Sequence, residues 1–218
     1  TSSSASGTLT DGGYTNTWDG SSGTSWSDAS NWSCGTVPTS SSLVVIADVS
    51  NQPVISGNAT ISSLTVNSGA EITVSSNALT VTGATDLNGK LIISEGTYNA
   101  DGSFDGNTGT TEFTGGGVLA LSSTVTNIGS ITNTSSTGTV KYDGTSAQNV
   151  DAPSSGSYAN LSIENASTKT AVGNIDVDGN LNTEAEASCV LDMSTYDLNV
   201  AGDLTIGRTG GLLASNSA

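Results

Sequence analysis

The stretch Val74–Gly83 (VSSNALTVTG) is matched 119 residues later by Met193–Gly202 (MSTYDLNVAG). Both copies alternate apolar and polar residues before a closing glycine. A second pair, Ser63–Asn67 (SLTVN) and Asn160–Asn165 (NLSIEN), repeats the alternation. A unit of this kind cannot bury its apolar face alone and must stack on its neighbours. The repeat therefore predicts a coil of stacked strands.

The same alternation continues outside these copies, and a period of two residues is the signal of a β-strand. It is clearest in four runs, some of which overlap these copies: Leu43–Ile46, Ile61–Val66, Ile72–Val81 and Leu198–Ile206. Glycines punctuate the strands, and we expect turns with a positive φ at four of them: Gly57, Gly69, Gly83 and Gly89. Strands of a β-sandwich usually run longer and carry larger aromatic residues. We predict an all-β fold, a single-stranded right-handed parallel β-helix (β-solenoid), with a β-sandwich as the alternative.

Composition agrees with a narrow coil. Only 34% of the 218 residues are hydrophobic and 5% are aromatic, which suits a core of slender Val, Ile and Leu side chains. We divide the chain into a Trp-rich N-terminal capping segment, residues 1–40, and an irregular β-solenoid, residues 41–218. The loosest stretch is expected at Tyr98–Gly117, which is rich in Asp-Gly and Gly-Gly pairs. The ending Gly210–Leu213 carries no polar cap, so we expect the coil to continue beyond Ala218.

The charge balance excludes several function classes. Twenty acidic residues face four cations and no histidine, for a net charge of −16. Phosphate backbones and anionic membrane surfaces are bound by Lys and Arg, so we expect neither nucleic acid nor a membrane as partner. No apolar stretch is long enough to span a bilayer. The missing histidine and the dispersed cations also argue against an enzyme: Lys90, Lys141, Lys169 and Arg208.

All three tryptophans, Trp18, Trp26 and Trp32, lie in the first 40 residues. Large rings at this position are typical of a cap over the open end of a solenoid, which solenoids need for solubility. The alternative is an aromatic platform that stacks on sugars. The sequence favours the cap.

Two groups of acidic residues are candidates for a calcium site. Asp176 and Asp178 alternate with apolar residues and should project from one outer face, and Asn180 extends the row. Asp101 and Asp105 form a looser second candidate. Oxygen ligands suit Ca²⁺, but the first group has no terminal Glu unless Glu184 or Glu186 bends back. Solvated turn residues are the alternative interpretation, and no other cofactor is expected.

The two cysteines are expected to be free. With about 20–25 residues per turn and strands about 4.8 Å apart, Cys34 and Cys189 lie on the order of 30 Å apart. A disulfide needs Cα atoms within about 7 Å.

Two stretches resemble known sequences. The first runs through Trp18-Asp19-Gly20, Trp26, Asn31-Trp32-Ser33, Gly35 and Val37-Pro38. The second runs through Val140-Lys141-Tyr142-Asp143-Gly144 and Gln148 to Tyr158, Asn160–Ile163 and Lys169-Thr170. Both are similar to segments of large, repeat-rich surface proteins of Bacteroidetes, which resemble adhesins and are often exported by the type IX route. The resemblance implies an architecture and an extracellular location. It carries over no catalytic residue.

These observations together predict an extracellular scaffold: a segment or subunit of a surface adhesin or filament, with self-association or neighbouring segments of the same polymer as its partners. A carbohydrate-binding module with a glycan ligand is the alternative, and a polysaccharide lyase is third.

Overall fold

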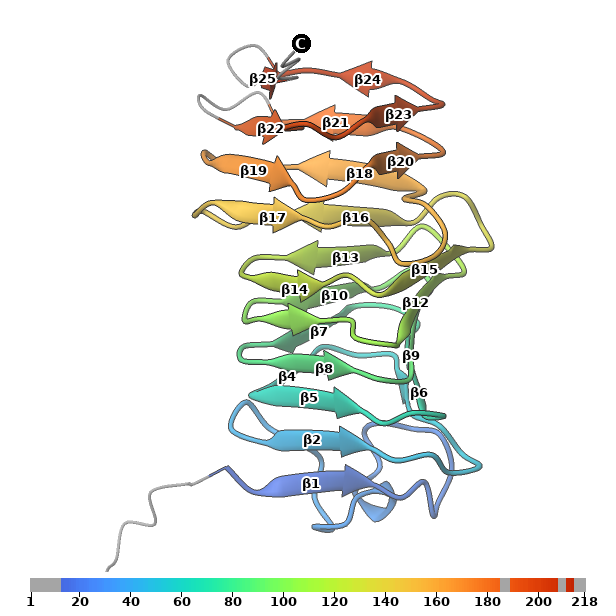
Figure 1. The fold of residues 1–218 in the computed structure, drawn as a ribbon. Helices are drawn as coiled ribbons and strands as arrows, with labels where there is room; N and C mark the ends of the chain where they lie inside the picture. The colour runs from blue at the N-terminus through green and yellow to red at the C-terminus, as the bar shows by residue number, and fades with distance from the viewer. Residues whose placement is uncertain (1–12, 185–188, 208–210, 214–218) are drawn as a thin grey trace, which may run out of the picture.

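The computed structural model describes residues 13–184, 189–207 and 211–213, which form 25 short strands and one 3-10 turn, η1 (Ala29–Asn31). Every pairing between these strands is parallel. The strands stack in a β-solenoid that runs from β1 to β25, and the longest sheet contains eight strands, one per turn (Figure 1). The coil is right-handed, the hand of nearly all parallel crossovers. The predicted fold class is confirmed and the β-sandwich alternative is wrong.

Each turn of the N-terminal half contributes one strand to each of three sheets. Sheet A contains β1 (Thr15–Trp18), β2 (Leu43–Ile46), β5 (Ser63–Val66), β8 (Thr85–Leu87), β11 (Phe104–Asp105) and β14 (Val125–Asn127). Sheet B contains β3 (Val54–Ile55), β6 (Glu71–Val74), β9 (Lys90–Ile93), β12 (Thr110–Phe113) and β15 (Ser130–Asn133).

Sheet C runs the length of the coil through β4 (Ala59–Ile61), β7 (Ala78–Val81), β10 (Thr97–Ala100), β13 (Val118–Leu121), β16 (Thr139–Tyr142), β18 (Asn160–Ile163), β21 (Leu181–Thr183) and β24 (Leu204–Thr205). In the C-terminal half, sheet D contains β17 (Gln148–Val150), β19 (Thr168–Ala171), β22 (Val190–Asp192) and β25 (Gly211–Leu213). Sheet E contains β20 (Ile175–Val177) and β23 (Leu198–Val200).

Alternate residues of each strand are buried, which is why period-two patterning identified them. Leu64 and Val66 of β5 are buried, while Ser63 and Thr65 between them are partly exposed. Because successive turns pair in register, each inward residue lies over the equivalent residue of the previous turn. One such column is Leu79, Tyr98, Leu119, Val140, Leu161 and Leu181. Register partners lie 19 residues apart at Thr80 and Asn99 and 23 apart at Leu181 and Leu204.

The irregular part of the coil differs from the prediction. Tyr98–Gly117 holds three strands of the ladder, β10, β11 and β12, because its Asp-Gly and Gly-Gly pairs are corners between strands. The pairing of β11 with β14 shifts register between Phe104 and Asp105. The interruption lies instead between β16 and β18. Sheets A and B end at β14 and β15, and residues 151–159 cross the side of the coil without a strand. Pro153 in this segment cannot donate a backbone hydrogen bond to a ladder.

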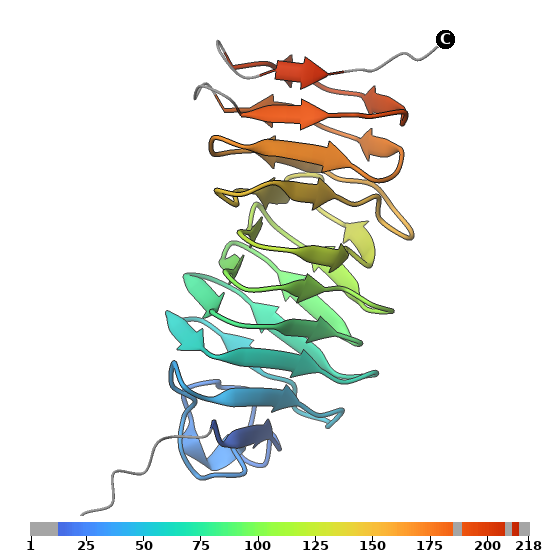
Figure 2. The same cartoon turned by 60° about the vertical axis from the view of Figure 1, so that its left-hand side comes forward.

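The coil also begins earlier than the predicted boundary at residue 41. Strand β1, within residues 1–40, pairs with β2 over its whole length and is the first strand of sheet A. Figure 2 shows the turns stacked one above another, with the N-terminal segment at one end. Residues 19–42, between β1 and β2, form the capping loop and contribute no strand to sheet A. The sequence did not reveal that the cap follows the first strand, because that strand (TNTW) is short and polar.

Glycines at the corners have a different role from the one predicted. Among the four expected to need a positive φ, only Gly69 has one, at +84°. Gly83 is needed for space, since a Cβ there would lie 2.6 Å from the backbone oxygen of Ser62 in the preceding turn. Gly102 is in the same position one turn later, where a Cβ would lie 2.1 Å from the backbone oxygen of Gly83. Close approach between stacked turns therefore selects glycine at these corners.

Substitution of Gly102 by alanine tests this close packing. The added methyl group collides with backbone, which cannot rotate away, so we expect a loss of about 1–3 kcal/mol in the free energy of unfolding. Urea denaturation followed by circular dichroism measures it. Gly57→Ala is the matched control, because a Cβ at Gly57 meets nothing within 4 Å and its φ is not positive. Equal stability of the two variants would contradict the explanation.

Candidate functional site

The three tryptophans form one buried cluster at the N-terminal end of the coil. Trp18 lies on β1, Trp26 in the following loop and Trp32 directly after η1, and their exposed fractions are 0%, 5% and 2%. Trp32 packs edge-to-face against both other rings, with centroid distances of 5.0 Å to Trp18 and 4.6 Å to Trp26. Such aromatic pairs add to the stability gained by burial.

Hydrogen bonds tie this cluster to the coil. The indole Nε1 of Trp18 donates to the backbone oxygen of Asn51 (2.7 Å), beyond β2, and that of Trp32 donates to the oxygen of Trp26 (2.9 Å). Asn31, fully buried beneath them, donates to Ser25 and accepts from Ser22. Burial supports the cap interpretation. A platform for sugar stacking needs exposed ring faces, and these three rings have none.

A groove of about 400 Å³ runs beside this cluster, between the capping loop and the turn that joins β3 to β4. Pro38 and the edge of Trp26 line one wall, and Asn58 and Thr60 lie on the other. No charged side chain lines the groove. Its hydroxyl and amide groups are the kind that bind a neutral, hydroxylated ligand such as a sugar. Sequence patterns did not indicate this groove, because its walls come from segments about 20 residues apart.

The side chains of the first calcium candidate each form a hydrogen bond to a different partner. Asp176, exposed on β20, accepts a hydrogen bond from Asn199 Nδ2 (2.8 Å) on the next turn, and Asp178 accepts one from Ser157 Oγ. Asn180 Oδ1 accepts from the backbone N–H of Asp203 (2.8 Å). Each oxygen thus bonds to an adjacent turn. Glu184 accepts from the backbone of Asn165 (2.8 Å), and Glu186 lies outside the described residues.

The second candidate is also divided. Asp101 lies exposed at the corner after β10, whereas Asp105 is on β11, where its carboxylate accepts from the backbone N–H of Asn107 (3.0 Å). Asn99 donates to Thr80 Oγ1 (3.2 Å) on the outer face of sheet C. In the described part of the chain, no three Asp, Glu, Cys or His side chains gather in a way that could hold a metal ion. Calcium binding stays a prediction.

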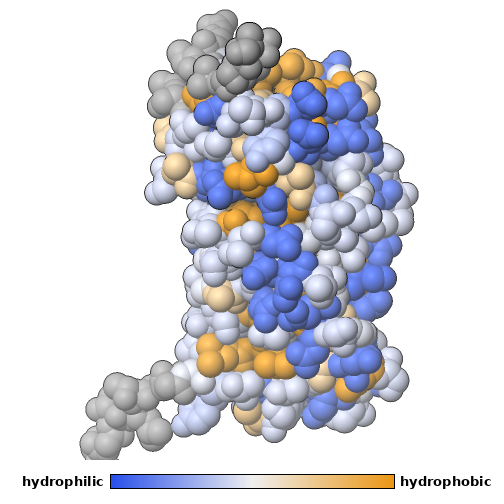
Figure 3. All heavy atoms as spheres, viewed as in Figure 1, coloured by the Kyte–Doolittle hydropathy of each residue, from blue (hydrophilic) through white to orange (hydrophobic). Residues whose placement is uncertain are grey.

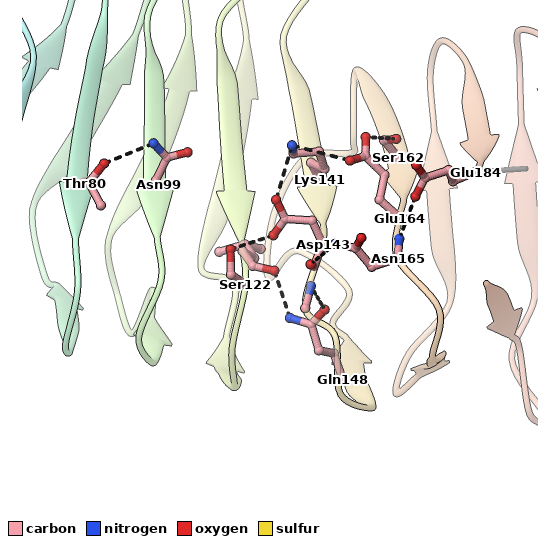
Figure 4. A network of polar contacts seen from close by, with 12 residues as sticks. Thr80, Asn99, Ser122, Lys141, Asp143, Gln148, Ser162, Glu164, Asn165 and Glu184 are labelled. Carbon is pink, nitrogen blue, oxygen red and sulfur yellow. Dashed lines mark hydrogen bonds and ion pairs between the residues drawn. The ribbon is translucent and has the colours of Figure 1, made fainter. Parts of the chain in front are cut away.

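The densest polar network lies on the outer face of sheet C (Figure 4). Lys141 of β16 lies between two carboxylates, with Nζ 3.2 Å from Asp143 and 3.4 Å from Glu164 on the next turn. Ser122 of the previous turn donates to Asp143 (2.7 Å), and Ser162 donates to Glu164 (3.0 Å). Stacking therefore brings Lys141, like Lys90 on sheet B, against an acid from a neighbouring turn.

The lysine of this network is not suited to act as a general base. Partial burial alone would lower the pKa of Lys141, but the hydrogen bonds and charges of Asp143 and Glu164 outweigh it and raise that pKa. Lys90 on sheet B is similar: its hydrogen bonds to Glu71 and Glu112 raise its pKa. Both amines stay protonated near neutral pH and cannot accept a proton from a substrate. The geometry is that of structural ion pairs between turns.

Sequence reasoning missed a second network, which lies inside the coil. Lys169 and Gln148, inward residues of β19 and β17, are 0% and 6% exposed. Tyr142 and Tyr158 are fully buried with their hydroxyls 3.1 Å apart, and Tyr158 also donates to the backbone oxygen of Asp151. These residues belong to the second of the two stretches quoted above for their resemblance to surface proteins, and nothing in the sequence marked them as a buried polar group.

The cysteines are both free, as predicted. Cys34 is exposed at the N-terminal end, and Cys189 is buried directly before β22. The thiol of Cys189 contacts the backbone oxygen of Ile163 (3.2 Å), and its pKa is raised because burial disfavours the thiolate. It is therefore a poor nucleophile.

Comparisons with known proteins add one match. Residues 17–114, from β1 to just beyond β12, match the model of a domain of unknown function, DUF8693. No curated protein and no solved structure matches the chain. Within the described residues no helix is long and apolar enough to cross a membrane.

Substitution of Trp32 by alanine tests the cap. Trp32 contacts both other rings, and its removal should lower the free energy of unfolding by about 3–5 kcal/mol. The control is Tyr14→Ala, because Tyr14 is 63% exposed at the same end and its loss should cost within about 0.5 kcal/mol. Denaturant unfolding measures both. A Trp32 variant as stable as the Tyr14 variant would show that the cluster is not a cap.

Alkaline pH should unfold the chain steeply. Burial raises the pKa of Tyr98, Tyr142 and Tyr158 well above the ordinary value of 10. Above about pH 10 the unfolded tyrosines lose protons while the folded ones keep them, so stability falls by about 1.4 kcal/mol per pH unit for each tyrosine. Lys169 acts in the opposite sense, since burial lowers its pKa, but only up to about pH 10.4.

The measurement is urea unfolding between about pH 10.5 and 12, a window set by these pKa shifts. Tyr98→Phe should reduce the slope of stability against pH by about one third, because one of three equivalent groups is removed. Phe113→Leu, a change of a buried ring without a hydroxyl, should lower stability and leave the slope unchanged. An unchanged slope in the Tyr98 variant would refute the assignment.

Proposed function

We propose that this chain is a segment of an extracellular structural scaffold, an adhesin or filament, whose C-terminal end associates with another parallel β-solenoid turn. The observation that carries the proposal is the contrast between the two ends. Buried tryptophans close the N-terminal end, while the last turn exposes apolar side chains and strand edges.

The sides of the coil are suited to a solvated rod. Outward positions carry Ser, Thr and Asn, and the two outward lysines of the described residues are each held between two carboxylates. Figure 3 shows hydrophilic side chains over much of one face, with separate apolar patches near the N-terminal end, along the side and at the C-terminal end. A net charge of −16 makes rods repel one another side by side. Association by the end is then favoured over association by the sides.

The last turn of the coil has features that would allow another β-solenoid turn to pack on it. Strands β23, β24 and β25 are the final members of sheets E, C and D, so one edge of each has no strand partner within the described residues. Leu204 and Ile206 are 45% and 40% exposed, and Tyr196 is 41% exposed. A hollow of about 470 Å³ beside them is lined by Met193, Leu198 and Leu212. A parallel turn with inward apolar residues would cover the hollow and satisfy the edges.

An extracellular location is supported by the Ser/Thr/Asn-rich composition and by the resemblance to bacterial surface proteins. Carbohydrate binding is the second candidate, and the neutral groove beside Trp26 is the feature that favours it. It would make the chain adhesive through its capped end. A lyase would need an accessible base, but Lys90 and Lys141 are paired with acids and Lys169 is buried.

Light scattering coupled to size exclusion tests association by the open end. At high protein concentration and in salt that screens the negative charge, the wild-type chain should form dimers or longer species. Leu204→Lys places a charge in the contact and should restore the monomer without loss of structure, since Leu204 is already half exposed.

The control is Val172→Lys, at an exposed apolar residue one turn before the end, which should associate like the wild type. A wild-type chain that stays monomeric under these conditions, or a Leu204 variant that associates normally, would reject end association. Binding of neutral glycans that is lost in Asn58→Ala would instead support the carbohydrate-binding alternative.

A further inference from the structure

The buried amine of Lys169 is the least expected group in the core. It is fully buried on β19, and no carboxylate bonds to it. Its Nζ donates to the backbone oxygen of Gly144 (2.7 Å) and to Ser167 Oγ. Burial lowers the pKa of this amine more than the electrostatic effects of Cys189 and Asp143 raise it, so the neutral amine, a nucleophile, is favoured there more than in water.

The carboxamide of Gln148 lies beside it. Gln148 of β17 is the direct register partner of Lys169, and both side chains point into the core, from strands about 4.8 Å apart. Both reach the same residue: Gln148 Oε1 accepts from the N–H of Gly144 (2.8 Å), and Lys169 Nζ donates to the oxygen of Gly144. Their polar ends therefore meet at a single residue.

The hydrogen bonds of the Gln148 carboxamide are those expected of an acyl group that a nucleophile attacks. The N–H of Gly144 bonds to its oxygen, where negative charge develops when a nucleophile adds to the carbon. Its Nε2 is fixed by two backbone acceptors, Leu121 (2.8 Å) and Ser123 (2.6 Å). Enclosure in the core excludes water, the competing nucleophile, and permanent proximity removes the entropic cost of encounter.

From this arrangement we propose that Lys169 and Gln148 form an intramolecular isopeptide bond that joins two successive turns of the coil. The amine nitrogen bonds to Cδ of Gln148, the bond from Cδ to Nε2 breaks, and ammonia leaves. The proton that the attacking nitrogen gives up is the one that the departing nitrogen takes, so no outside acid, oxidant or cofactor is consumed. Ser167 Oγ accepts a hydrogen bond from Nζ and is itself bonded to the oxygens of Gly144 and Ser146, so it fixes the position of the amine.

The position gives the bond a structural purpose. It joins β17, directly before residues 151–159, to β19, which follows them, close to the place where sheets A and B end. A covalent link here ties together the two chain segments on either side of the stretch that has no strand. This inference is independent of the proposed end association.

Intact-mass spectrometry of the folded, purified chain is the test, followed by peptide mapping. The expected result is a mass lower than that of the sequence by one ammonia, and a branched peptide that joins Lys169 to Gln148. Loss of ammonia by succinimide formation at Asn88-Gly89 gives the same intact mass, so the branched peptide decides between them. Lys169→Arg should restore the full mass, and Lys141→Arg, on the outer face, should leave the link intact.

The mass of the wild-type chain in denaturant provides a readout that does not depend on the variants. A covalently linked chain keeps the mass deficit after it is unfolded. A folded wild-type chain with the full sequence mass, or a branched peptide absent from a complete map, would overturn the proposal.

Discussion

The in-register stacking of parallel turns is the constraint on which the rest of this molecule depends. Strands of neighbouring turns lie about 4.8 Å apart, and every backbone ladder bond crosses between turns. A strand residue therefore always stacks on the equivalent residues of the turns above and below it, and only corner residues are free of this constraint. The inward columns hold mainly apolar side chains, such as Leu79, Leu119 and Leu161. Corners must admit the backbone of the next turn, which selects glycine at Gly83 and Gly102.

The same stacking governs polar residues. A charge on the outer face lies near residues one turn away, so Lys90 contacts Glu71 before it and Glu112 after it. Inside the core, one polar side chain requires another beside it. Gln148 and Lys169 satisfy backbone groups of the corner at Gly144, and Tyr142 and Tyr158 satisfy each other. Thr85 and Tyr98 form a similar buried pair in the N-terminal half, with their hydroxyls 2.8 Å apart.

Much of the fold could be predicted from local pattern. Alternation identified β2, β5, β6 and β7, and the tryptophans were recognised as the distinctive part of the N-terminal end. The site was less predictable. Asp176 and Asp178 alternate with apolar residues, yet their partners are Asn199 and Ser157, about 20 residues away. The interruption was assigned to Tyr98–Gly117, because glycine pairs at a corner and in a loop look alike in a sequence.

The sequence by itself determined the strand period, the slender core and the absence of a histidine-based site, because these follow from which residues are present and how they alternate. The tertiary structure alone decided which residues meet across turns. Register partners lie 28 residues apart between β1 and β2 and between 19 and 23 apart in the later turns, with the length of each corner, so neighbours cannot be counted off along the chain. Only stacking brought Lys141 between two acids, buried the three indoles, and placed the amine of Lys169 beside the carboxamide of Gln148.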